Sequence, residues 1–261
     1  MSFDLEAYLA RIGVTRADVS RPDVATLDRL VWAHVSHVPF ENLDILLGRP
    51  IRIDLDSVFA QLVTARRGGY CFQQNALFAA VLRELGFHVT TLGGRVGSDH
   101  RTARRTHMLL EVRPPDSDIT YLADVGFGGN CPTKSFPLAI GSYPTSHGTL
   151  SLRDDGDDYL MLEVDGYGPL YAFTREPFYP IDYEVANYYT STHPDSFFTH
   201  RPRLSKVTER GYRTFTDGQL SLREGPTLID RRPVAAGDFV AMLARDFGLE
   251  FPPGTTFRGV E

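Results

Sequence analysis

Cysteine is scarce in this chain: among its 261 residues, Cys71 and Cys131 alone carry a thiol. Two cysteines are too few for the disulfide framework that stabilises small secreted domains. Neither cysteine has a second one at the spacing of a zinc site, so we expect a protein without a bound metal. Cys131 stands in an Asn-Cys-Pro segment, and we interpret it as a structural residue.

Long apolar runs and runs of basic residues are missing as well. No apolar segment approaches the length of a membrane-spanning helix, and residues 1–13 lack the basic start and apolar centre of a signal peptide. The formal net charge of −6 at pH 7 argues against a nucleic-acid partner. We therefore expect a soluble, cytoplasmic protein that binds neither nucleic acid nor a membrane.

The first third of the chain has the periodicity of helices. Hydrophobic residues make up 42% of the chain, an ordinary value for a globular protein that can bury a large core. A fourth helical segment begins at Cys71 and stops near Gly86, a residue type that often ends helices. Together the segments predict a small helical bundle. The three preceding segments, with apolar residues every three or four positions, are 5–12, 23–38 and 54–63.

Beyond Gly86 the pattern changes to the period of two that is typical of strands. Turn signals rich in proline, glycine and aspartate separate these segments, and Asp217 with Gly218 predicts a hairpin turn. The fold class is therefore α+β, with an antiparallel sheet or barrel in the middle of the chain. The expected strands are 88–92, 95–96, 107–112, 119–124, 159–164, 170–173, 204–207, 212–215 and 219–222, and further helices are expected over 183–189 and 234–248.

The segment around Cys71 carries the strongest functional signal. Gly68 and Gly69 allow a tight turn directly before the cysteine. Cys71 is then expected in the first turn of its helix, where unpaired N–H groups and the helix dipole favour an anion. Because Arg66 and Arg67 precede it closely, we expect the thiolate form to be favoured. A buried structural cysteine is the alternative, and it is the more frequent case for a cysteine taken at random.

A cysteine nucleophile needs a base, and the base needs a group that orients it. His107 begins one predicted strand, and Asp124 ends the next. If the turn between them is centred on Pro115 and Asp116, the two residues face each other across the hairpin, about 5 Å apart at Cβ. A shift by two residues leaves them diagonal neighbours, whereas a shift by one places them on opposite faces. We predict a catalytic triad of Cys71, His107 and Asp124.

Each member of this triad also has an ordinary interpretation. The chain has eight histidines, and any one of them is more often a surface or hydrogen-bonded residue than a base. An aspartate at the end of a strand more often belongs to a turn or a helix cap. The prediction therefore depends on the combination of the three residues.

Three glycines follow Asp124 closely: Gly126, Gly128 and Gly129. Glycine lets main-chain N–H groups approach an anion, so we predict a pocket floor or a site for a phosphate-bearing cosubstrate. A flexible loop is the alternative, and the Lys-Ser/Thr pair of an ATP-binding P-loop is missing. Phe127 either lines an acceptor pocket or belongs to the core.

Two other segments receive no firm role. His37 and Glu41 flank Pro39, but the sequence shows no partner for either residue. Residues 188–194 mix hydroxyl groups with aromatic rings. They either cap a helix, which is the interpretation we favour, or contact a cosubstrate.

Taken together, these segments resemble the arylamine N-acetyltransferases. The resemblance extends from the first helices to about residue 200, and the C-terminal remainder resembles the family loosely. Gln73 and Gln74 depart from it, because many bacterial members have Glu and a variable residue there. The segments that carry the resemblance are Arg66, residues 68–72, Asn75, Thr106 with His107, residues 124–129, residues 39–44 and residues 191–194.

The resemblance implies three parts around a cysteine-protease-like core. These are a helical bundle with the nucleophile over residues 1–87, a central antiparallel β-barrel with the histidine and aspartate over 88–190, and a C-terminal α/β lid over 191–261. It also implies ping-pong transfer of an acetyl group from acetyl-coenzyme A to an arylamine, arylhydroxylamine or arylhydrazine, as in xenobiotic metabolism. The residues expected to contact substrate or coenzyme A are Thr106, Gly126, Phe127, Gly128 and Gly129.

Two alternative functions stay open at this point. A cysteine hydrolase or an amide synthase would use the same triad with another acyl donor. A non-catalytic binding module could have the same fold, although the intact triad argues against it. The sequence does not fix the preferred amine, the acyl chain or the oligomeric state, with a dimer among the possible states.

Overall fold

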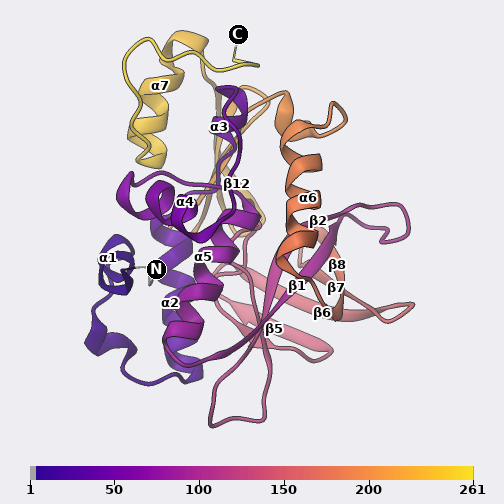
Figure 1. Ribbon diagram of the computed structural model, residues 1–261. Coiled ribbons are helices and arrows are strands. Elements are labelled where there is room, and N and C mark those ends of the chain that lie inside the picture. Colours follow the sequence, from indigo (N-terminus) through magenta and orange to yellow (C-terminus); the bar gives the residue numbers. More distant parts are fainter. Residues whose placement is uncertain (1–3, 261) are drawn as a thin grey trace.

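The computed structural model describes residues 4–260 (Figure 1). Every helix that the sequence predicts in the first 87 residues is confirmed. Within residues 4–260, no helix combines the length and the apolar character needed to cross a bilayer. The α-helices are α1 (Leu5–Arg11), α2 (Val24–His37), α3 (Leu43–Leu46), α4 (Leu55–Phe59), α5 (Cys71–Glu84), α6 (Pro180–Thr192) and α7 (Phe239–Met242); shorter 3-10 or π turns are Arg16–Val19, Ala60–Thr64, Phe197–Thr199, Ala236–Asp238 and Leu243–Phe247.

Capping side chains fix the points at which several helices begin. At the start of α2, the Asp23 carboxylate accepts a hydrogen bond from the Thr26 main-chain N–H at 2.9 Å. Asp4 plays the same part for α1. The helix α5 ends before Gly86, whose φ of +95° continues the chain in a conformation that glycine adopts without strain.

Eight antiparallel strands form one sheet that curves into a nearly closed barrel. The order of the strands is β4-β3-β2-β1-β8-β7-β6-β5, so β2 is an interior strand. The strands are β1 (His88–Val96), β2 (Arg105–Arg113), β3 (Tyr121–Ala123), β4 (Phe136–Pro137), β5 (Gly141–Thr145), β6 (Gly148–Gly156), β7 (Tyr159–Val164) and β8 (Gly168–Pro177).

The C-terminal part is a second antiparallel sheet covered by helices. Asp217 and Gly218 both have positive φ and join the paired residues Thr216 and Gln219, so the predicted hairpin turn is confirmed. Figure 1 shows α3 and α7 at this end of the molecule, away from the barrel strands. The strands, in the order β12-β11-β10-β9, are β9 (Arg203–Val207), β10 (Gly211–Thr216), β11 (Gln219–Glu224) and β12 (Thr227–Pro233).

Several strands differ from the prediction. The sequence predicts two strands over 88–96, whereas β1 runs through this segment with a register shift between Gly94 and Arg95, as at a bulge. The strands β4, β5, β6 and β12 are not predicted at all. All seven residues of β12 are exposed, so this strand has no alternation of buried and exposed side chains for the sequence to reveal. The helix α6 is longer than its prediction over 183–189.

A shared core fixes the helical part against the barrel. Phe78 and Val81 of α5 belong to the same cluster of buried side chains as Leu110 and Val112 of β2. The helix that begins with the candidate nucleophile therefore packs on the strand that carries the candidate base. The limits of separate domains near residues 87 and 190 stay predictions.

A second link joins the segment before α5 to the C-terminal sheet. Phe40 exchanges main-chain hydrogen bonds with Ser205 of β9, at 2.8 and 3.0 Å, and also bridges to Gly69. Asn42 adds to this link, because its side chain donates to the main-chain oxygens of Phe198 and Arg201. The three parts of the fold therefore meet around the turn that precedes Cys71.

Truncation of Phe78 tests this shared core. The Phe78 side chain is completely buried, so Phe78→Ala should lower the free energy of unfolding by about 3–5 kcal/mol. The control Val185→Ala removes a side chain that is 70% exposed and should change stability by about 0.5 kcal/mol or less. Urea unfolding followed by circular dichroism measures both. Equal midpoints for Phe78→Ala and the wild type would contradict the packing described.

Candidate active site

Cys71 lies at the first position of α5, as predicted. Its side chain is buried, with the sulfur 3.6 Å from the main-chain oxygen of Thr106 in β2. The preceding residue, Tyr70, has an extended conformation and forms the N-cap. The first N–H groups of a helix lack intrahelical partners, so the sulfur lies beside the positive end of the α5 dipole.

Close approach of main chains at two glycines makes this placement possible. A Cβ atom on Gly68 would lie 2.1 Å from the main-chain oxygen of Pro39, and one on Gly126 would lie 2.7 Å from the Cα of Cys71. Both distances are far shorter than van der Waals contact, so no side chain fits at either position. Glycine thus lets the loop after β3 pack directly against Cys71.

Asp124 is completely buried and follows β3 directly. Its Oδ2 lies 2.7 Å from Nε2 of His107. Its Oδ1 accepts hydrogen bonds from Asn75 Nδ2 and from the main-chain N–H of Gly126, both at 2.9 Å. Three donors thus compensate for the removal of this carboxylate from water.

The protonation of the pair follows from these contacts. Burial lowers the pKa of His107, but the Asp124 carboxylate outweighs burial, and with a further contribution from the Cys71 side chain the pKa rises to about 10. Burial acts to raise the pKa of Asp124, but His107 and the other donors hold it below its ordinary value. Nε2–H of His107 therefore donates to the carboxylate, and Nδ1 is the nitrogen left for the sulfur.

The same shift affects stability in a defined direction. The folded-state pKa of His107 lies above the ordinary value of about 6.5, so protonation of the ring in the folded state stabilises the fold. This contribution is complete below about pH 6.5 and is lost as the pH rises toward about 10.

The predicted register of the hairpin is wrong by two residues. The pairs Leu110–Ala123 and Val112–Tyr121 show that the direct partner of residue 107 would be residue 126, not Asp124. The connection is longer than the predicted two-residue turn, because β2 ends at residue 113 and β3 begins at residue 121. A shift by two preserves the face of the sheet, so the histidine and the aspartate still meet.

Cys71 and His107 line one cavity of about 420 Å³. Thr106, Gly126, Phe127 and Gly129 also line it, whereas Gly128 lies against the ring of Phe40, where a Cβ atom would be 3.1 Å from the ring. One wall is largely aromatic, with Phe40, Tyr189, Phe197 and Phe198, and another wall comes from the strands β9 and β10. The volume and the aromatic wall suit a small ring system next to the sulfur.

Two aromatic rings hold the imidazole in place. The centroid of Phe127 lies 5.3 Å from that of His107 in an edge-to-face arrangement, and that of Tyr171 lies 4.7 Å away. Phe127 packs against the core and also lines the cavity, while its contact with an acceptor stays a prediction. Tyr171 lies in a predicted strand as one apolar residue among several, and nothing in the sequence distinguishes it.

Residues 188–194 contain the last turn and the C-cap residue of α6, His193, so the favoured capping interpretation is confirmed there. The hydroxyl groups of Thr190, Ser191 and Thr192 donate to main-chain oxygens four residues earlier within α6. Tyr189 and Thr190 of this segment also line the cavity.

Cys131 lies apart from this cavity. Its sulfur is 3.4 Å from the main-chain oxygen of Asp124, and burial raises the pKa of the thiol well above its ordinary range. Within residues 4–260, no group of three or more His, Cys, Asp or Glu side chains could hold a metal ion.

Comparison with known proteins assigns this chain to a family. The family profile described as N-acetyltransferase matches residues 23–255. An arylamine N-acetyltransferase of Mycolicibacterium smegmatis is 41% identical, over 96% of this chain and 93% of that protein. The chain belongs to the arylamine N-acetyltransferase family. It is therefore an acyltransferase.

Solved structures of arylamine N-acetyltransferases share the fold. The Mycobacterium marinum arylamine N-acetyltransferase, solved in complex with CoA, is 33% identical with a TM-score of 0.88, over 94% of this chain and 93% of that one. The Nocardia farcinica arylamine N-acetyltransferase is 37% identical with the same TM-score, over 96% and 90% of the two chains. The expected fold class, with helical bundle, barrel and lid, is confirmed.

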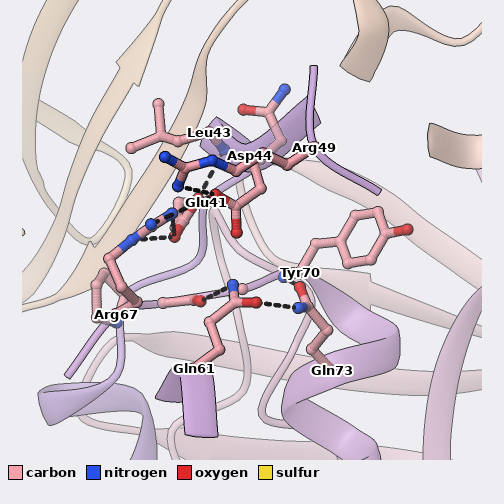
Figure 2. Close-up of polar contacts among 12 residues, drawn as sticks. Glu41, Leu43, Asp44, Arg49, Gln61, Arg67, Tyr70 and Gln73 are labelled. Carbon is pink, nitrogen blue, oxygen red and sulfur yellow. Dashed lines mark hydrogen bonds and ion pairs between the residues drawn. The ribbon is translucent and has the colours of Figure 1, made fainter. Parts of the chain in front are cut away.

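In this member of the family, the segment 39–44 supports the turn before Cys71 (Figure 2). Oε1 of the buried Glu41 accepts from Nη2 of Arg67 at 2.6 Å, and Oε2 accepts from the Leu43 main-chain N–H at 2.6 Å. Asp44 lies 3.4 Å from Nη1 of the same arginine. Burial lowers the pKa of Arg67, but the two carboxylates outweigh burial and raise it above its ordinary value.

These contacts correct two expectations. Glu41 has a partner that the sequence does not reveal, and His37 contacts the main-chain oxygen of Ala33 at 2.9 Å. Arg67 is directed toward Glu41 (Figure 2), and neither Arg66 nor Arg67 is among the residues that line the cavity with Cys71. The helix start and His107 are thus the groups that adjoin the sulfur at this cavity.

Gln73 and Gln74, which depart from the family pattern, both make hydrogen bonds in the buried core. Gln73 accepts from the Tyr70 main-chain N–H and donates to Gln61 at 2.9 Å (Figure 2). Gln74 donates to the Gly69 main-chain oxygen at 2.8 Å and contacts His34 at 3.1 Å. Both amides therefore stabilise the turn before Cys71 through its main-chain groups.

Replacement of Asp124 tests the cause of the His107 pKa. In Asp124→Asn the carboxylate charge is lost, burial then dominates, and the pKa of His107 should fall from about 10 to below the ordinary 6.5. Titration of the His107 ring by NMR measures this change. The control Asp116→Asn alters an exposed aspartate and should leave the titration unchanged. A His107 that still titrates near pH 10 in Asp124→Asn would contradict the assignment.

Replacement of Arg67 tests the support of the turn. Arg67→Met leaves Glu41 buried without its cation, which should lower the free energy of unfolding by about 3–5 kcal/mol. The neighbouring Arg66 is exposed, so Arg66→Met is the matched control and should have little effect. Chemical unfolding of both variants decides the matter, and equal stabilities would contradict a supporting role for the Glu41–Arg67 pair.

Proposed function

We propose that this chain transfers an acetyl group from acetyl-coenzyme A to an arylamine, arylhydroxylamine or arylhydrazine by a ping-pong mechanism. Cys71 carries the acetyl group between the two substrates, and Cys71, His107 and Asp124 act as the catalytic triad. The observation that carries this proposal is the hydrogen bond between His107 and the buried Asp124, at the wall of the cavity that also contains Cys71. The CoA complex of the Mycobacterium marinum relative supports a coenzyme A thioester as the acetyl donor.

The first half-reaction forms the acetyl-enzyme. The Cys71 thiolate attacks the thioester carbonyl, and the new sulfur–carbon bond replaces the bond to coenzyme A. The imidazolium of His107 gives its Nδ1 proton to the departing coenzyme A thiolate, which leaves as a thiol. The high pKa of His107, which Asp124 maintains against burial, keeps that proton present at neutral pH.

The second half-reaction returns the enzyme to its starting state. The amine nitrogen attacks the acetyl carbon of acetyl-Cys71, and neutral His107 accepts the proton that the nitrogen loses. Cys71 leaves as a thiolate beside the restored imidazolium. Weakly basic aromatic amines suit this step because they are unprotonated near neutral pH. The buried Asp124 orients the ring and stabilises its positive charge throughout.

Main-chain donors fit the negative charge that develops on the carbonyl oxygen. The N–H of Cys71 points along the start of α5, where helix N–H groups lack partners. Thr106, Gly126, Phe127 and Gly129 line the same cavity, and we propose that donor or acceptor contacts them there. Gly128 allows the loop to pack closely against the ring of Phe40.

Mass spectrometry of the intact protein tests the acetyl-enzyme. After incubation with acetyl-coenzyme A alone, the wild type should gain one acetyl group on Cys71, and subsequent addition of an arylhydrazine should remove it. Cys71→Ser is the control and should not form this thioester. Folded wild type that stays unmodified would falsify the ping-pong scheme. Rapid amide hydrolysis without coenzyme A would instead favour a cysteine hydrolase.

A further inference from the structure

The wall of the cavity formed by the C-terminal sheet is polar, unlike the aromatic wall. Arg203 and Ser205 of β9 pair across the strands with Thr216 and Thr214 of β10, and all four residues line the cavity. Residues two apart in a strand share a face. One face of this sheet therefore presents a guanidinium and three hydroxyl groups to the space next to Cys71.

Two polar atoms on this wall are buried without a partner. Nε of Arg203 and Oγ of Ser205 have no hydrogen-bond partner in the part of the chain that the structure describes, residues 4–260. Buried polar groups are normally hydrogen-bonded. The nearest carboxylate to Arg203 is that of Asp217, 3.5 Å from Nη2, and Asp217 also pairs with Arg201 at 3.4 Å. This wall therefore has hydrogen-bonding groups that the protein itself, over residues 4–260, does not satisfy, and one carboxylate serves two arginines.

The charged residues of the cavity lining also favour an anion near Arg203. Apart from His107, which pairs with Asp124, the lining contains two arginines and one carboxylate: Arg104, Arg203 and Asp195. Arg104 and Asp195 lie 4.0 Å apart and offset each other. Arg203 is the remaining arginine of the lining, and its carboxylate partner Asp217 lies outside the lining and is shared with Arg201. The ring of Phe197, 5.5 Å from the guanidinium carbon, further limits where the group can lie.

We propose that Arg203 is a specificity-determining residue that binds the carboxylate of an acidic arylamine. The planar guanidinium matches a carboxylate and donates two hydrogen bonds to it. The aromatic ring of the acceptor packs between Phe127 and the other aromatic side chains of the cavity, with its amine toward Cys71. This inference rests on the proposed function, because it concerns which amine accepts the acetyl group.

The test compares two acceptors that differ in charge. 4-Aminobenzoate and 4-aminobenzamide have nearly the same shape, and kcat/KM is measured for each at saturating acetyl-coenzyme A. The wild type should prefer the benzoate. In Arg203→Gln the ratio of the two kcat/KM values should fall about 10-fold or more, since a hydrogen-bonded charge is lost. In the control Arg201→Gln the ratio should stay unchanged, because Arg201 shares Asp217 but is exposed and does not line the cavity.

Further outcomes separate this inference from its alternatives. An unchanged ratio in Arg203→Gln overturns it. A second outcome also overturns it: the ratio is unchanged and the KM for acetyl-coenzyme A rises, while the KM for S-acetyl-N-acetylcysteamine, a donor without phosphates, stays the same. Arg203 would then bind the phosphates of the donor. If Arg203→Gln does not fold, Arg203→Lys replaces it and should have an intermediate ratio. Failure of the wild type to acetylate either amine, together with the absence of an acetyl group on Cys71 after incubation with acetyl-coenzyme A, refutes the proposed function itself, a result distinct from equal use of both amines.

Discussion

The buried hydrogen bond between Asp124 and His107 is the interaction on which the site depends. A carboxylate without exposure to water is stable only where donors surround it, and here His107, Asn75 and Gly126 supply them. These donors come from a strand, from the helix of the nucleophile and from the loop after β3. The compensation of one charge therefore fixes three separate segments against one another, and the same charge keeps the histidine protonated.

The sequence predicts the residues of this arrangement better than its geometry. The placement of Cys71 follows from a glycine turn and helical periodicity, which are local signals. The shared face of His107 and Asp124 follows from the period of two in strands, although the predicted register is wrong because the connection between the strands is longer than two residues. A shift by two residues changes the register but leaves each side chain on the same face of the sheet.

Contacts between distant segments explain most of what the sequence does not predict. Glu41 and Arg67 lie 26 positions apart, and no periodicity relates them. The polar wall of the cavity depends on the pairing of β9 with β10, so Arg203 shows no functional signal until the sheet is formed. The exposed strand β12 lacks an apolar face altogether. Local sequence signals thus identify the candidate catalytic residues. The side chains that support them, and the polar wall of the cavity, are defined only by tertiary structure.

The central claim is that the acetyl group passes through Cys71 before the amine reacts. Initial velocities measured over a range of acetyl-coenzyme A concentrations, at several fixed concentrations of an arylamine, test it most directly. A covalent intermediate formed before the second substrate binds gives parallel lines in a double-reciprocal plot, with coenzyme A released first. Our account predicts this pattern. Intersecting lines, which indicate that both substrates must be bound before transfer begins, would contradict it.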